Sequence, residues 1–221
     1  MKILSLLPSA TEIVYALGLE DALKGVTQEC DHPPGARGKP VVSTTSLPPL
    51  NDVAPEEIDR LVSDSVGAGE PLYRIDEDLV RDIRPDLILA QDLCRVCAVP
   101  SGQIADALQM LGCSAEVISL DPNTVGDVIT GIETVGNAAG AAGRAGKVAA
   151  GLRERVARVE ERARDLPRVR TLALEWPEPP FIGGHWVPEM IRLAGGIDVL
   201  GTEGAPSRRA TWSEIASSAP E

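Results

Sequence analysis

Four aromatic side chains near the C-terminal end of the sequence form its most suggestive group for ligand binding. Trp176, Phe181 and Trp186 fall within eleven residues, and Trp212 follows. The segment around Phe181 is rich in proline, so these rings are not obvious core residues. Rigid rings in such a loop suit a flat, partly apolar ligand. An equally supported interpretation is a loop that plugs the interior of its own small lobe.

Cys94 and Cys97 form a Cys-x-x-Cys motif, which is typical of redox and zinc sites. A thioredoxin-like motif would open a helix directly, whereas Pro100 here places the helix start after the motif. A zinc site needs two more ligands, which Cys30 and His32 could supply from a neighbouring loop. We favour a pair of packed loop thiols, with redox or zinc chemistry as the alternative.

Other catalytic and cofactor motifs are missing from the sequence. There is no Gly-x-Gly-x-x-Gly after the first predicted strand and no Gly-x-x-x-x-Gly-Lys-Ser/Thr, so no nucleotide cofactor is expected. The 2 histidines leave few candidates for a Ser-His-acid or Cys-His arrangement. We therefore expect a protein that is not an enzyme and has no catalytic residues.

Charge is distributed unevenly along the chain. The net charge is −12, which argues against a general nucleic-acid-binding protein. Residues 144–170 nevertheless carry 9 Lys and Arg against 4 Asp and Glu. We interpret this basic band as the solvated face of a helix, with an RNA-binding helix as the alternative.

The N-terminal segment does not have the features of an export signal. Pro8 and the acidic Glu12 follow directly after a short apolar stretch, with no small-residue cleavage site. No apolar run reaches the roughly 18 residues of a membrane helix, so no membrane insertion is expected. A chain that begins naturally at Met1 would stay in the cytoplasm.

The elements that must position these side chains alternate between strands and helices. Strands are predicted over 3–7, 23–27, 41–43, 86–90, 115–120 and 169–174. Helices are predicted over 55–66, 76–83, 101–111, 187–194 and 211–217, and a first helix is expected to be capped by Ser9. This alternation favours an α/β fold with a parallel sheet, whose ligands bind outside the carboxyl ends of the strands.

One segment breaks the alternation. From Thr124, with Asp127 three positions on, apolar residues keep a helical spacing to about Asp165. A helix of this length would span roughly 60 Å, more than one small lobe can cover. We predict a helix over 124–165 that links two lobes, 1–123 and 166–221. A break in the Gly- and Ala-rich stretch 137–151 is the alternative.

Several short motifs, in order along the whole chain, resemble one family: Ser5–Glu12, Asp31–Pro34, Arg84–Ile88, Pro179–Phe181 with Gly183, and Gly195–Gly196 before Trp212. The family is that of cobalamin-binding proteins in the ABC-importer class III (helical backbone) periplasmic binding protein superfamily. The resemblance implies two Rossmann-like lobes joined by one long backbone helix. It also implies a corrinoid, siderophore or haem held in the cleft between the lobes.

The resemblance further implies roles for individual residues. Tyr73, Phe181 and Trp212 would face the ligand, and the loop from Cys94 to Val99 looks like that of a cobalamin-type subgroup. Members dock on an ABC permease through one acidic residue on each lobe. Asp78 fits the first position, whereas Ser218 stands near the second.

The same resemblance bears on length and location. The C-terminal lobe is expected to be incomplete, because the family pattern continues with another strand beyond Pro220. Importer-bound relatives carry a signal peptide or lipid anchor, so the resemblance implies a periplasmic or extracellular protein.

These observations predict a non-enzymatic binding protein that holds a corrinoid between two lobes. The alternatives are haem, a ferric siderophore or a metal ion in the same fold, or a thiol redox or zinc site at the two motif cysteines. The predicted ligand-binding residues are Tyr73, Cys94, Cys97, Trp176, Phe181, His185, Trp186 and Trp212.

Overall fold

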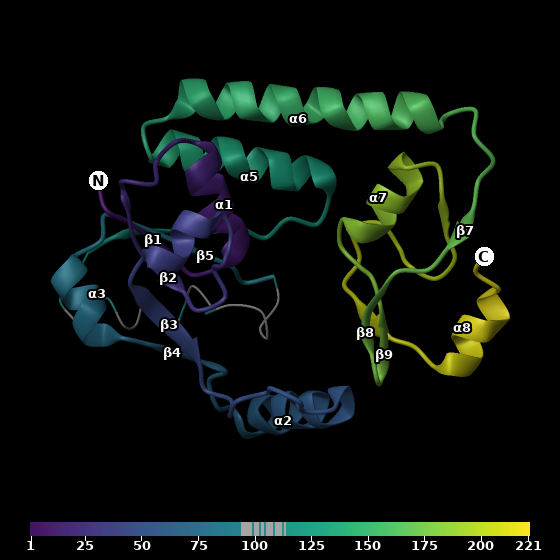
Figure 1. The fold of residues 1–221 in the computed structure, drawn as a ribbon, viewed down its shortest axis with the longest axis horizontal. Coiled ribbons are helices and arrows are strands. Elements are labelled where there is room, and N and C mark those ends of the chain that lie inside the picture. Colours follow the sequence, from purple (N-terminus) through teal and green to yellow (C-terminus); the bar gives the residue numbers. More distant parts are fainter. Residues whose placement is uncertain (94–98, 100–101, 103, 105–107, 109–111, 113) are drawn as a thin grey trace. The chain divides into compact units, whose positions relative to one another are not determined.

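The computed structural model describes residues 1–93, 99, 102, 104, 108, 112 and 114–221 (Figure 1). The predicted Cys94–Cys97 site and most of the helix predicted over 101–111 lie outside these residues.

The described chain divides into two compact units. The first consists of Met1–Leu50, Leu61–Asp121 and Ile132–Val148, and the second of Asn51–Arg60, Pro122–Gly131 and Ala149–Glu221. Each unit therefore draws on separate stretches of the chain. The domain limits 1–123, 124–165 and 166–221 stay predictions.

The first unit is built on a six-stranded sheet with the order β4-β3-β2-β1-β5-β6. Its strands are β1 (Ile3–Ser5), β2 (Leu23–Thr27), β3 (Val41–Thr45), β4 (Tyr73–Ile75), β5 (Leu87–Ala90) and β6 (Glu116–Ser119). All neighbours pair in parallel except β3 and β4, which are antiparallel. Strand β5 is buried along its whole length, as expected for a central parallel strand. The predicted mixed α/β fold is confirmed.

Helices and aliphatic side chains complete this unit. The helical elements are α1 (Pro8–Ala16), the 3₁₀ helix η1 (Pro34–Gly38), α3 (Glu77–Ile83) and the part of α2 (Pro55–Ala68) that follows Arg60. One side of the sheet packs a core that includes Leu4, Val42 and Ile88 against Val80 of α3. The predicted Ser9 cap is wrong. Helix α1 begins earlier, at Pro8, because proline suits the first helical position; its N-cap residue Leu7 offers no side-chain bond.

The predicted linking helix is interrupted, so the alternative of a break in its Gly- and Ala-rich part is correct. The chain forms α5 (Val125–Ala138) and α6 (Ala142–Ala163), which Figure 1 shows as two helices joined by a short turn. Gly140 in the turn has φ +67°, a left-handed conformation that ends α5. Close packing of α5 on α6 needs Gly136, because a Cβ atom there would lie 2.2 Å from the Cβ of Ala145.

Besides its parts of α2, α5 and α6, the second unit contains short strands and two short helices. Strands β7 (Arg170–Thr171) and β10 (Ile197–Asp198) pair in parallel. Strands β8 (Leu174–Pro177), β9 (Pro180–Ile182) and β11 (Arg208–Arg209) form an antiparallel sheet with the order β11-β9-β8. Helices α7 (Val187–Leu193) and α8 (Trp212–Ser218) follow β9 and β11. The proline-rich segment predicted as a loop is therefore largely a β-hairpin.

Candidate functional site

The three-stranded sheet of the second unit places three side chains in one row. Trp176 on β8 is paired with Phe181 on β9, and Phe181 is paired with Arg209 on β11. Because paired residues on adjacent strands point to the same face, these side chains lie side by side. The flanking residues Pro180 and Ile182 point the other way and are buried. The row therefore lies on the face of the sheet opposite to its buried side.

Trp212 joins this row through the β8–β9 turn. It opens α8, where Thr211 caps the helix by accepting a hydrogen bond from the backbone N–H of Glu214 at 3.1 Å. The indole Nε1 of Trp212 donates to the carboxylate of Glu178 at 3.3 Å, and Nε1 of Trp176 donates to the carbonyl of Glu178 at 2.9 Å. One turn residue thus holds both indoles, while half of the Trp212 surface stays exposed (50%).

Arg209 is held by two neighbours. Its guanidinium carbon lies 5.4 Å from the centroid of the Phe181 ring, within the range of a cation–π interaction. Its Nη2 donates to the carboxylate of Asp59 at 2.6 Å. Asp59 lies in the part of α2 that belongs to the second unit, far from Arg209 in sequence. We call Trp176, Phe181, Arg209 and Trp212 the aromatic row, with Arg209 its cation.

His185 and Trp186 form a separate pair in the same unit. Their ring centroids are 6.0 Å apart with a 34° tilt. His185 has φ +52°, a left-handed backbone conformation that few residues other than glycine adopt; its N–H donates to the carbonyl of Ala205 and its carbonyl accepts from the N–H of Gly204. Its ring Nδ1 lies 3.4 Å from Oδ1 of Asn123. The two backbone bonds hold the main chain at His185, and Asn123 is the polar neighbour of its ring. Among the described residues, no contact joins this pair to the aromatic row.

Tyr73 occupies the first unit, at the start of β4 and opposite Thr45 of β3. It is half-buried and packs against the aliphatic core of that unit. Burial, with a smaller contribution from the charge of Glu29, raises the pKa of its phenol above the usual value, so the hydroxyl stays protonated at neutral pH. Its predicted contact with the ligand stays a prediction.

The first unit also contains a buried polar cluster that sequence reasoning missed. Thr11 of α1 donates to the hydroxyl of Ser5 at 2.8 Å and lies 3.1 Å from the sulfur of Cys30. Burial raises the pKa of the Cys30 thiol. His32 is exposed two residues away. Within the described residues, no group of three or more His, Cys, Asp or Glu side chains could hold a metal ion.

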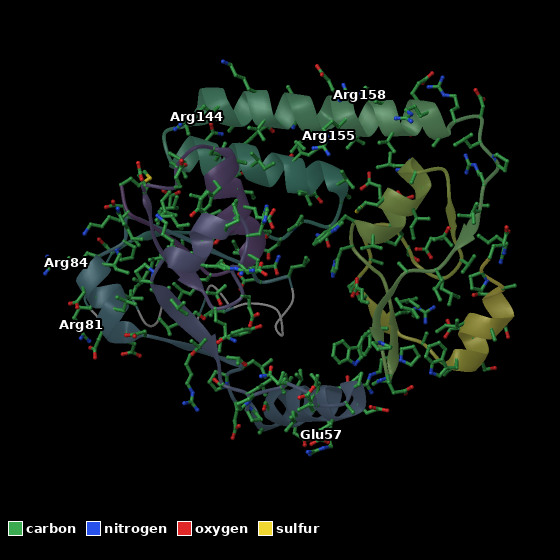
Figure 2. All side chains as sticks on the ribbon, viewed as in Figure 1. Glu57, Arg81, Arg84, Arg144, Arg155 and Arg158 are labelled. Carbon is green, nitrogen blue, oxygen red and sulfur yellow. The ribbon has the colours of Figure 1, made fainter. Side chains whose placement is uncertain are left out.

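The basic band lies mostly on α6, where Arg144, Arg155 and Arg158 are exposed (Figure 2). Arg158 pairs with Glu154 one turn away at 3.7 Å, and Arg164 pairs with Glu161. Such exposed pairs are typical of a solvated helix face and contribute little stability. Within the described residues, no helix combines the length and apolar character needed to cross a bilayer.

The two positions considered for permease docking differ in chemistry. Asp78 in the first turn of α3 has a side chain that is 88% exposed and pairs with Arg81. Ser218 ends α8, and its hydroxyl donates to the carbonyl of Ile215 at 2.7 Å. Asp78 therefore offers an accessible carboxylate, and Ser218 offers none.

A model of the periplasmic binding protein family matches residues 3–221. The chain belongs to this family. Its fold is that of the class III periplasmic binding proteins. An ABC transporter substrate-binding lipoprotein of Bacillus subtilis is 27% identical over 170 residues. That match covers 76% of this chain but 43% of the relative, so it spans less than half of that relative's length.

Solved structures agree on the fold. The periplasmic vitamin B12-binding protein of Vibrio cholerae superposes with a TM-score of 0.71 at 21% identity, covering 99% of this chain and 73% of that one. A periplasmic haem-binding protein of Roseiflexus superposes with a TM-score of 0.69 at 18% identity, with the same coverage. At this level of identity the likeness establishes the fold and leaves the ligand open. The family also gives no support to the cytoplasmic location expected from the N-terminal sequence.

Proposed function

We propose that this binding protein holds a corrinoid and delivers it to an ABC permease. The observation that carries the proposal is the aromatic row, because it presents an indole and a phenyl ring on one face of a small sheet, with a second, half-exposed indole held at the same β8–β9 turn. Flat macrocycles gain most from rigid, partly exposed rings of this kind. The vitamin B12-binding relative supports a corrinoid as the ligand, and the lipoprotein relative supports a role in ABC transport outside the cytoplasm.

Asp78 is the proposed contact on the permease side. Its carboxylate is exposed in the first turn of α3, and its pairing with Arg81 is an exchangeable surface contact. The corresponding position in the second unit carries Ser218, so docking there would need a different group. Replacing Asp78 with Asn should leave ligand affinity unchanged while weakening capture by a cognate permease.

The ligand is tested by titrating the purified protein with cyanocobalamin and following heat release by calorimetry. We expect saturable binding with one ligand per chain and a dissociation constant below tens of micromolar. Trp176→Ala should weaken binding about tenfold or more, because the lost ring buries a large apolar area. Tyr15→Phe, which changes an aromatic residue of the first unit, serves as the matched control. Absence of heat at tens of micromolar would refute the corrinoid proposal.

Haem is the second candidate, favoured by the likeness to the Roseiflexus protein. Haem iron takes an axial ligand from the protein, and His185 is the imidazole of the second unit. Titration with haemin would then give a Soret band that shifts on binding. If the wild-type protein shows this shift, His185→Ala loses it and cyanocobalamin gives no heat, the proposed ligand is haem and not a corrinoid.

A further inference from the structure

The two arginines of β11 have different surroundings. Arg208 pairs with Glu214 of α8 at 2.6 Å, an arrangement that ties the strand to the next helix. Arg209 instead points along the aromatic row, over Phe181 and against Asp59. Consecutive strand residues point to opposite faces, so the structure places one cation with α8 and the other with the rings.

The contacts of Arg209 orient its guanidinium while leaving it accessible. The Arg209 side chain is 56% exposed, whereas that of Asp59 is 22% exposed. The bond to Asp59 uses Nη2, and a guanidinium has five N–H donors in one plane. An exposed ion pair of this type adds little stability, so stability alone does not account for the arrangement. A planar cation fixed beside partly exposed rings is a site for an anionic group.

We propose that Arg209 is a specificity-determining residue that binds a phosphate or carboxylate group on the edge of the ligand, with Asp59 as its positioning residue. The inference rests on the proposed function, because the rings of the aromatic row would hold the flat part of the same ligand. In cobalamin the anionic group is the phosphodiester of the nucleotide tail. In haem it is a propionate carboxylate. The planar N–H donors of Arg209 can bind the phosphodiester or the propionate in the same way.

The test compares ligands that differ in the anionic group. Cyanocobalamin is compared with dicyanocobinamide, which lacks the phosphodiester, and haemin with its dimethyl ester, which lacks free carboxylates. Dissociation constants are measured for the wild-type protein, for Arg209→Gln and for the matched control Arg208→Gln. Arg209→Lys keeps the charge without the planar donors, and thermal unfolding confirms that each variant is folded.

We expect Arg209→Gln to weaken binding of the anionic member of the bound pair about tenfold or more. Binding of the matching ligand without the anion should change by less than about twofold, and Arg208→Gln should leave both unchanged. Arg209→Lys should retain part of the preference. Equal weakening of both members, or no weakening of either, would overturn the role of Arg209 and leave the proposed function standing. If the wild-type protein binds none of the four ligands, both the role of Arg209 and the proposed function are overturned.

Discussion

The contact between α5 and α6 leads to a quantitative prediction about Gly136. A Cβ atom at this position would lie 2.2 Å from the Cβ of Ala145, about 1.5 Å closer than two carbon atoms tolerate. Ala145 is 1% exposed, so its methyl group cannot turn aside into solvent. Gly136→Ala should gain about 1 kcal/mol from helix propensity and lose about 3 kcal/mol from overpacking. The net effect is a loss of about 2 kcal/mol.

A double-mutant cycle isolates the contact. Ala145→Gly alone should cost about 1 kcal/mol in helix propensity. In the double variant Gly136→Ala/Ala145→Gly the methyl group moves from one helix to the other, so stability should return to within about 0.5 kcal/mol of wild type. The two positions would then be coupled by about 3 kcal/mol, well above the value for independent sites.

Urea unfolding monitored by circular dichroism measures these differences. Gly146→Ala is the matched control, because Gly146 lies in α6 and a Cβ atom there meets nothing within 4 Å. That variant should be more stable than wild type by about 0.5–1 kcal/mol. If Gly136→Ala were stabilised to the same degree as Gly146→Ala, the close packing of the two helices would be refuted.

Three further predictions concern a buried core residue, the N-cap of α8 and the pH dependence of stability. Ile182→Ala should cost about 2–5 kcal/mol in urea unfolding, because the side chain is 2% exposed; a loss below about 1 kcal/mol would contradict its burial. Thr211→Ala should cost about 1 kcal/mol through loss of the bond to the Glu214 N–H, whereas Thr211→Ser should be nearly neutral. Burial raises the pKa of the Cys30 thiol above its ordinary 9.0, so the stability that the protonated thiol contributes is complete below pH 9.0 and is lost as the pH rises further. Cys30→Ala should therefore flatten the decline of the unfolding free energy at alkaline pH. An unchanged slope in the variant would contradict this role of Cys30.

The sequence predicts the central strand β5 of the first unit well because it is a continuous aliphatic run. Residues 87–90, which form β5, are all buried and carry no polar side chain, so the pattern permits little else. Strand β4 escaped prediction because it has three residues and includes Arg74. Its place in the sheet depends on antiparallel pairing with β3, a contact that no local pattern encodes.

The segment predicted as a linking helix, 124–165, shows a different limit. Helical spacing of apolar residues continues on both sides of Gly140, so periodicity does not distinguish one long helix from two. What decides is the left-handed backbone at Gly140, together with the close approach that Gly136 permits. Glycine and alanine in the sequence indicate that a break is allowed, and tertiary packing determines that it occurs.

In the candidate site, the rings were predictable and their partners were not. Trp176, Phe181 and Trp212 stood out because aromatic residues are rare in this chain. Arg209 and Asp59 did not, since their contact joins residues 150 positions apart. The pair of arginines directly before Ala210 was the available signal, but nothing local distinguishes the arginine that pairs with α8 from the one beside the rings.

The chain crosses several times between its two units, which affects how the units can be expressed separately. Three of the crossings fall inside helices: at 60/61 in α2, at 131/132 in α5 and at 148/149 in α6. Neither unit is a contiguous reading frame, so a single cut cannot yield a fragment that holds all of one unit and none of the other. Expressed halves would carry severed helices with uncovered apolar stripes, and should be recovered as insoluble material unless they are produced together. Insertions that spare the helices belong in turns such as the one at Gly140, rather than at these three boundaries inside α2, α5 and α6.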